Sequence, residues 1–307
     1  MTKIHPNTFK SLKNLETLSL FDNKLSSIEP STFTGLTNLK EIYLYRNKLI
    51  ELQSEIFKGL GNLTLLYLGE NQLTEISSLA FKELHKLEHL RLSDNRIETI
   101  RTNSFNGLNN LKEIHLNSNR LKKIFKDTLS FIINLTELHL EDNEINQIEP
   151  NSFNGLFKLS ALKLNNNKLT SITAETFTGL SGLVKLDLSS NHLSSLPTFT
   201  GISNIEKLSL GSNIISTIEP GTFKNLPNLN ELDLSKNLIV KLDTLVFTNL
   251  NNLVTLNIGM NHIKALDPFM FTGMIKLSQV DLKGNDLNRS LVKFIDNMYP
   301  KCSIIFS

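Results

Sequence analysis

Residues 15–25 read LETLSLFDNKL, and this phrase decides the fold. Its pattern, LxxLxLxxNxL, returns at residues 39–49 as LKEIYLYRNKL and then continues along the chain. The Asn recurs every 24 residues, with one interval of 22 residues before Asn213. Chance does not hold five positions in register over such a length, so the chain is built from repeats. Twelve copies carry the Asn, which we predict to form a structural ladder: Asn23, Asn47, Asn71, Asn95, Asn119, Asn143, Asn167, Asn191, Asn213, Asn237, Asn261 and Asn285.

Each copy also has a second half, in which an aliphatic residue precedes the pattern FxxL. Ile28, Phe33 and Leu36 show it first, and a Phe recurs at the same place in most later copies. Leu129 replaces the Phe in one copy, and the copy that ends at Phe199 is two residues shorter. We predict that this Phe column fills the side of the core away from the strands.

The phrase itself predicts a short strand. Alternate side chains of a strand point to opposite faces, so Leu18 and Leu20 should point inward and Ser19 outward. Strands of neighbouring copies would pair in parallel, about 4.8 Å apart. The Asn amide could then hydrogen-bond buried loop backbone that would otherwise lack partners. No copy can bury its apolar face alone, so stability must come from its neighbours.

This pattern resembles the 24-residue typical class of leucine-rich repeat proteins, such as Toll-like receptor ectodomains, Slit-like proteins and small proteoglycans. The resemblance implies a mostly-β, right-handed solenoid of horseshoe shape. A curved parallel sheet would form its concave face, and loops or 3-10 turns its convex face. We predict one domain over residues 1–307, with a partial repeat at 1–14, twelve repeats at 15–287 and a C-terminal capping segment at 288–307. Within that segment, residues 289–298 predict an amphipathic helix and residues 302–306 a strand.

Composition excludes several classes of protein. With 40% hydrophobic residues the chain can bury a core, and its net charge of +2 argues against a dedicated nucleic-acid binder. No apolar run approaches the roughly 20 residues of a membrane span. The only cysteine, Cys302, excludes multi-Cys metal sites and lies in an apolar stretch that predicts a buried structural thiol. The common nucleotide-binding and hydrolase motifs are missing, so we expect neither an enzyme nor a cofactor.

The resemblance implies an extracellular or cell-surface protein of receptor or adhesion type. The sequence starts inside a repeat, without the apolar stretch of a signal peptide, so we expect a fragment of a longer protein. The alternative is an intracellular scaffold or regulatory subunit, which the lack of disulfide-paired caps would suit.

Function should lie in the outward strand positions that the repeat leaves free. Three of the four Tyr fall there in adjacent copies, beside Phe21 and Leu65. Exposed aromatic residues on a rigid scaffold are typical of an interface core, although they can also simply stabilise a sheet. Outward positions of the first six copies hold eight acidic residues and two Arg, a net charge of −6. Such a face would attract a protein with a basic patch and repel nucleic acid, or it would only keep the protein soluble.

Three His, at 89, 115 and 139, lie in neighbouring copies among these acidic residues. Two of them could share a metal ion, but we expect solvent-exposed strand His and no metal site. Their protonation below about pH 6.5 would neutralise part of the acidic face. We therefore predict a protein ligand, with no nucleic acid and no membrane segment. The predicted binding residues are Phe21, Glu41, Tyr43, Tyr45, Leu65, Tyr67, His89, Arg91, Glu113, His115, Glu137 and His139.

Overall fold

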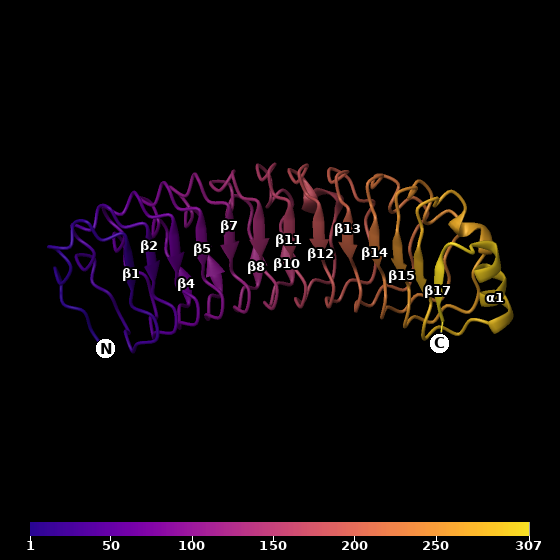
Figure 1. The fold of residues 1–307 in the computed structure, drawn as a ribbon, viewed down its shortest axis with the longest axis horizontal. Helices are drawn as coiled ribbons and strands as arrows, with labels where there is room; N and C mark the ends of the chain where they lie inside the picture. The colour runs from indigo at the N-terminus through magenta and orange to yellow at the C-terminus, as the bar shows by residue number, and fades with distance from the viewer. Residues whose placement is uncertain (307) are drawn as a thin grey trace. The chain divides into compact units, whose positions relative to one another are not determined.

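Each repeat contributes one three-residue strand, and the strands of successive repeats pair in parallel (Figure 1). The computed structural model describes residues 1–306, so Ser307 of the predicted capping segment lies outside the described residues. The chain divides into two compact units, Met1–Leu159 and the residues from Ser160 onward. The strands of the first unit's sheet are β1 (Thr17–Ser19), β2 (Glu41–Tyr43), β3 (Leu65–Tyr67), β5 (His89–Arg91), β7 (Glu113–His115) and β9 (Glu137–His139).

The second unit follows the same plan. Its strands are β11 (Ala161–Lys163), β12 (Lys185–Asp187), β13 (Lys207–Ser209), β14 (Glu231–Asp233), β15 (Thr255–Asn257), β16 (Gln279–Asp281) and β17 (Ser303–Ile305). In both units each strand residue faces its counterpart in the next repeat, as Leu18 faces Ile42. The prediction of a mostly-β solenoid of parallel strands is confirmed.

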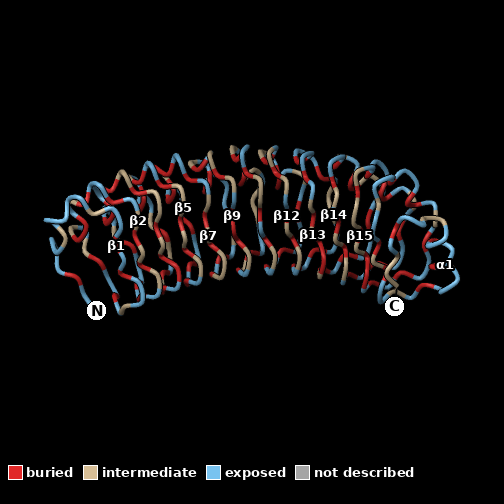
Figure 2. The backbone as a smooth tube through the Cα atoms, viewed as in Figure 1, coloured by how far each residue is buried: buried red, intermediate tan, exposed pale blue. Residues whose placement is uncertain are grey.

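The core lies behind the strands and follows the predicted alternation (Figure 2). Leu18 and Leu20 are buried, while Ser19 between them is exposed. The Phe column is packed ring against ring, as Phe57 shows: its ring centroid lies 6.3 Å from that of Phe33 and 6.0 Å from that of Phe81. Ten Phe of the column are at most 2% exposed, namely Phe33, Phe57, Phe81, Phe105, Phe153, Phe177, Phe199, Phe223, Phe247 and Phe271.

The recurring Asn satisfies buried backbone in its own repeat and in the one before. Asn119 Nδ2 donates to the carbonyl oxygens of Leu92 (2.9 Å) and Leu116 (3.1 Å), while its Oδ1 accepts the Ile97 amide at 3.0 Å. The same three contacts recur at Asn71 and at most other copies. Each repeat is thereby tied to its neighbour through groups that water does not reach.

A second column of Asn, near the start of the repeats, was not predicted. Its amides donate to a carbonyl oxygen of the preceding repeat at the protein surface, as Asn110 Nδ2 does to His85 at 2.6 Å. Side-chain exposure distinguishes this column from the buried one. Its other members include Asn38, Asn62, Asn134, Asn204, Asn228 and Asn252.

The segments opposite the main strands are mostly turns, with a few regular pieces. Two short parallel pairs join neighbouring repeats there and were not predicted: β4 (Glu75–Ile76) with β6 (Thr99–Ile100), and β8 (Lys123–Ile124) with β10 (Gln147–Ile148). Two 3-10 helices occur in the second unit, η1 (Ala174–Phe177) and η2 (Pro268–Phe271). Among the described residues, no helix combines the length and apolarity that a membrane crossing requires.

The short repeat keeps the strands in register. Lys185 still faces Lys207 and Leu186 still faces Leu208, although only 22 residues separate them. Phe199 remains fully buried, so the turn before it is the part of the repeat that is two residues shorter.

The C-terminal segment has the predicted elements. Helix α1 spans Arg289–Met298, and the Asn288 side chain caps it by accepting the Ser290 amide at 2.7 Å. Strand β17 then extends the sheet beside β16. Cys302 is buried as expected, and burial, with a smaller contribution from Asp296, raises the pKa of its thiol. A protonated thiol is a poor nucleophile, which agrees with a structural role.

Two glycines test how closely neighbouring repeats pack. Gly107 and Gly155 both have a φ of +96°, which costs an L-residue about 1–2 kcal/mol. A Cβ on Gly107 would lie 2.2 Å from the Lys82 carbonyl oxygen, whereas a Cβ on Gly155 would meet nothing within 4 Å. We expect Gly107→Ala to lower the free energy of unfolding by about 1–3 kcal/mol more than Gly155→Ala. Urea unfolding followed by circular dichroism measures both, and equal losses would contradict the close approach.

Candidate ligand-binding surface

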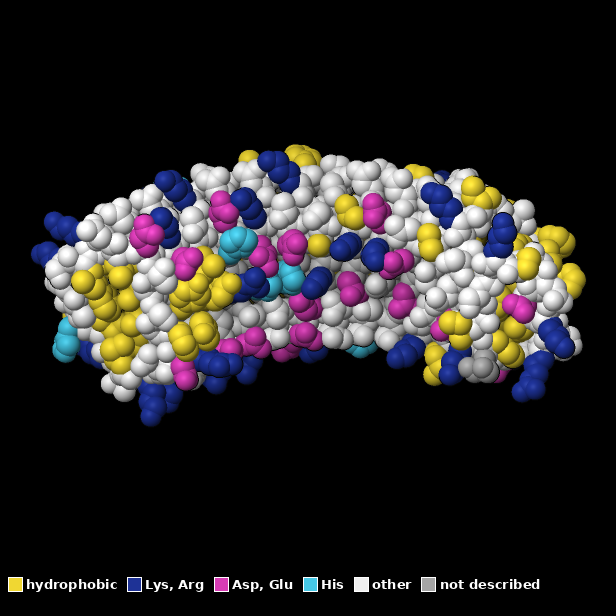
Figure 3. Space-filling model, in the orientation of Figure 1, with side chains coloured by type: hydrophobic (Ala, Val, Ile, Leu, Met, Phe, Trp, Pro, Cys, Tyr) yellow, Lys and Arg dark blue, Asp and Glu magenta, His cyan; other side chains and the backbone are white. Residues whose placement is uncertain are grey.

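The predicted binding residues lie on the outward side of the first unit's sheet, which we call the sheet face. Parallel register places ten of them in two rows, each with one residue per repeat, and Phe21 and Tyr45 follow the second row by two residues. The first row is Thr17, Glu41, Leu65, His89, Glu113 and Glu137; the second is Ser19, Tyr43, Tyr67, Arg91, His115 and His139. Hydrophobic side chains gather over the first strands, and His and charged side chains follow them (Figure 3).

Four rings in two contacting pairs make up what we call the aromatic cluster: Phe21 with Tyr45, and Tyr43 with Tyr67. Phe21 and Tyr45 stack with ring centroids 4.8 Å apart and an interplanar angle of 3°. Tyr43 and Tyr67 meet edge to face at 5.3 Å. Both arrangements are favourable for aromatic pairs, so the rings hold one another in place. They nevertheless stay open to solvent: Phe21 is 45% exposed and the three Tyr are half-buried.

Polar groups fix the edges of the aromatic cluster. The Tyr43 hydroxyl donates to Glu41 Oε2 at 3.0 Å. Burial and this hydrogen bond to the carboxylate raise the pKa of Tyr43, so its hydroxyl stays protonated. The Arg91 guanidinium lies over the Tyr67 ring, 5.4 Å from its centroid, which is within cation–π range. Polar contacts therefore restrain the Tyr43–Tyr67 pair in addition to its ring contact.

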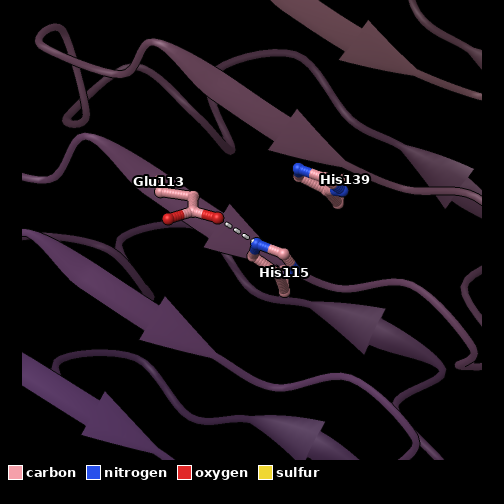
Figure 4. A group of neighbouring side chains, drawn as sticks. All are labelled: Glu113, His115 and His139. Carbon is pink, nitrogen blue, oxygen red and sulfur yellow. Dashed lines mark hydrogen bonds and ion pairs between the residues drawn. The ribbon is translucent and has the colours of Figure 1, made fainter.

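Beyond Arg91 lies a second group, which we call the histidine cluster: Glu113, His115 and His139. Glu113 and His115 project from β7 and contact each other through Oε1 and Nε2, and His139 lies beside them on β9 (Figure 4). The two imidazoles are stacked with ring centroids 3.9 Å apart. His139 is 7% exposed and His115 is half-buried, so the expectation of solvent-exposed strand His was wrong for both. Neighbouring strands bring the rings together and each shields the other from water.

The Glu113 carboxylate contacts three side chains of the sheet face. Besides His115, its oxygens receive His89 Nδ1 at 2.9 Å and Arg91 Nη2 at 3.0 Å. Burial alone would raise its pKa, but the hydrogen bonds from the two His and the charge of Arg91 outweigh burial and lower the pKa to about 2. Glu113 thus stays ionised, and its charge is offset locally rather than projected toward a distant ligand.

Burial and neighbouring charges also affect the two imidazoles of the histidine cluster. The pKa of His115 is lowered, mainly by burial and further by His139 and Arg91, although its hydrogen bond to Glu113 opposes the shift. His139 contacts two carboxylates of its own repeat: Nδ1 lies 3.1 Å from Glu141 Oε1 and Nε2 lies 3.5 Å from Glu137 Oε2. Glu141 was counted in the acidic face but left out of the predicted binding residues. Its spacing was the signal for it, because Glu141 follows His139 by two residues, just after the end of β9.

Other acidic residues near the sheet face are exposed, and we call four of them the rim carboxylates: Asp22, Glu70, Asp94 and Glu137. Glu137 is exposed, and the acidic residues that precede the ladder Asn sit in left-handed turns, as Asp22 (φ 53°) and Asp94 (φ 56°) do. Glu70 in the same position pairs with Arg46 Nε at 2.9 Å. The rim carboxylates, rather than Glu113, are therefore the ones that a solvent-borne ligand would meet first.

Comparisons with known proteins agree with the repeat fold. A model of the BspA type leucine-rich repeat region matches residues 2–120, and a leucine-rich repeat model matches residues 133–193, 197–239 and 227–287. No curated protein sequence matches the chain.

Solved structures are similar over nearly the whole chain. The Toll–Spatzle complex of Drosophila matches 96% of the chain at 25% identity and a TM-score of 0.85, and the chain spans 39% of the matched protein. A leucine-rich repeat protein of Leptospira interrogans matches 99% at 28% identity and a TM-score of 0.81, with 81% of its own length covered. The complex of TLR13 with ssRNA13 matches 100% at 24% identity and a TM-score of 0.70, with 52% covered.

Periodic sequence, parallel strands, buried Asn and these matches all agree. The chain belongs to the leucine-rich repeat proteins.

Proposed function

We propose that the chain is a non-catalytic recognition module that binds a protein ligand on the sheet face of its first unit. The observation that carries the proposal is the aromatic cluster, whose rings are fixed by one another yet remain partly exposed. Large aromatic side chains held rigid in this way lose little entropy on binding and dominate protein interfaces. Phe21, Tyr43, Tyr45 and Tyr67 would be the anchors.

Charge favours a protein with a basic patch over a nucleic acid. Asp22 and Glu70 lie in the same repeats as Phe21 and Tyr67, and a phosphate backbone would be repelled by the acidic side chains where a Lys- or Arg-rich patch would be attracted. The similarity to Toll, whose structure was solved as a complex with Spatzle, supports a protein ligand. The resemblance to typical-class leucine-rich repeat proteins favours an extracellular or cell-surface setting. The TLR13 complex shows that a similar solenoid can also hold RNA, so here the argument rests on the acidic face rather than on the fold.

The test is a comparison of captured proteins in an extract of the source organism. Immobilised wild-type chain should retain a protein that the triple variant Tyr43→Ala, Tyr45→Ala, Tyr67→Ala retains at least tenfold less, because each anchor contributes about 2 kcal/mol or more. The matched control replaces three residues of one strand row in the second unit, Lys163, Asp187 and Ser209, by Ala.

Circular dichroism and thermal unfolding must show that both triple variants fold. The control should retain the same protein as the wild type. Raising the salt concentration should slow the capture of that protein by the wild-type chain, since the rim carboxylates act mainly on the association rate. If the tyrosine variant keeps the whole wild-type set of proteins, the aromatic cluster is not the binding site.

A further inference from the structure

We propose that the histidine cluster is a binding site for one divalent transition-metal ion, with zinc as the best fit. Glu113, His115 and His139 each offer one ligand atom, and these atoms lie within 4.8 Å of one another. The two His come from neighbouring strands that are locked in register, so the backbone holds the ligands at a fixed spacing. Zinc binding concerns the chain alone and does not depend on the proposed protein ligand.

The donor set suits zinc. Two imidazoles and one carboxylate are the protein ligands of open zinc sites, which leave a fourth position for water or another ligand. Tetrahedral bonds of about 2.0–2.1 Å place ligand atoms roughly 3.4 Å apart. The widest spacing, up to 4.8 Å, must therefore close by roughly 1.4 Å, while the hydrogen-bonded Glu113 and His115 atoms must move apart, and both changes require side-chain rotation. Calcium and magnesium prefer all-oxygen sites and fit less well.

Burial and outer contacts distinguish this group from ordinary surface His. The side chains of His139, His115 and Glu113 are 9%, 15% and 19% exposed. Glu141 Oε1 lies 3.1 Å from His139 Nδ1, an arrangement that orients metal-binding imidazoles, and a metal at His139 Nε2 would replace that atom's 3.5 Å contact with Glu137 Oε2. On the other side, an ion between His115 Nε2 and Glu113 Oε1 would take the place of the proton that joins these atoms now.

Arg91 is the cation that holds the site together without a metal. Its Nη1 lies 2.5 Å from His115 Nε2 and 2.9 Å from His115 Nδ1, and its Nη2 lies 3.0 Å from Glu113 Oε1. A dication at the cluster would repel the guanidinium, which already lies over the Tyr67 ring and can turn further toward it. Arg91 is therefore a competitor of the metal, and its removal should strengthen metal binding.

The experiment is a calorimetric titration of the purified, metal-free chain with zinc chloride. We expect one zinc ion per chain in the wild type. The affinity should fall roughly tenfold or more in each of His115→Ala, His139→Ala and Glu113→Gln, because even outer-shell changes cost 10–100-fold. It should rise in Arg91→Gln. The matched control is His192→Ala, which removes an exposed His elsewhere and should leave the affinity unchanged.

Cobalt provides a second readout, because a four- or five-coordinate Co²⁺ ion absorbs visible light far more strongly than the hydrated ion. The wild type should show this absorption and Glu113→Gln should lose it. If His139→Ala fails to fold by circular dichroism, Glu113→Gln decides the matter, since it keeps the shape of the side chain. Absence of zinc binding, or binding that the cluster variants change no more than His192→Ala does, would overturn the proposal.

Discussion

Replacing Phe57 by Ala is expected to lower the free energy of unfolding by about 3–5 kcal/mol. The Phe57 ring is 2% exposed and lies between the rings of Phe33 and Phe81. Its removal leaves a cavity between two repeats, and a solenoid has only nearest-neighbour contacts to make up the loss. Urea unfolding of the purified variant, followed by circular dichroism, measures the effect.

The matched control is Phe157→Ala, which removes the same side chain from a site that is 59% exposed. Surface substitutions of this kind usually change stability by no more than about 0.5 kcal/mol. If the two variants lose similar free energy of unfolding, the Phe column does not stabilise the packing of neighbouring repeats as its burial indicates.

The second large effect is expected from Asn119→Asp, which keeps the shape of the side chain and exchanges its amide for a carboxylate. The Oδ1 contact with the Ile97 amide can survive. The other oxygen, however, would face the carbonyl oxygens of Leu92 and Leu116, to which the amide now donates. A buried charge without a partner costs about 3–5 kcal/mol, and we expect a loss of this size at neutral pH.

The loss should depend on pH with a defined sign. Burial and the two carbonyl oxygens raise the pKa of the introduced carboxyl group above its value in the unfolded chain. The folded state therefore binds the extra proton more tightly, and stability relative to the wild type should recover as the pH falls and decline as it rises. Denaturant unfolding at several pH values shows this directly.

Asn110→Asp is the matched control, because Asn110 makes its hydrogen bond at the surface. There water can solvate the new charge, and a loss of no more than about 1 kcal/mol is expected at any of these pH values. A pH-independent loss at Asn119 would mean that the buried carbonyl oxygens are not what the substitution disturbs.

Sequence reasoning predicted the repeat-level features because each of them recurs. Leu18, Phe57 and Asn119 occupy positions that return in nearly every copy, so periodicity alone assigns them to the core. The helix over 289–298 was predicted for a different reason, its amphipathic pattern just after the last repeat; the Asn288 cap was seen only in the structure.

The outward side chains were harder to predict, because they do not repeat. Their contacts depend on which residue happens to stand 24 positions away. Arg91 between Tyr67 and Glu113 is an example, and so is the burial of His139 against His115. Sequence could place these residues in the right rows. It could not show that stacking would remove two His from water, nor that Glu113 would be shared by three positive or polar donors.

The repeat that lacks two residues has a consequence for how such a chain can change. Because β12 and β13 keep their register there, a turn of this fold can lose two residues while the strand rows stay aligned. Natural variation in length should therefore accumulate in the turns before the Phe column. The outward rows, by contrast, can exchange one residue for another freely without gaining or losing any. A lineage could thus alter what the surface recognises while its scaffold stays unchanged.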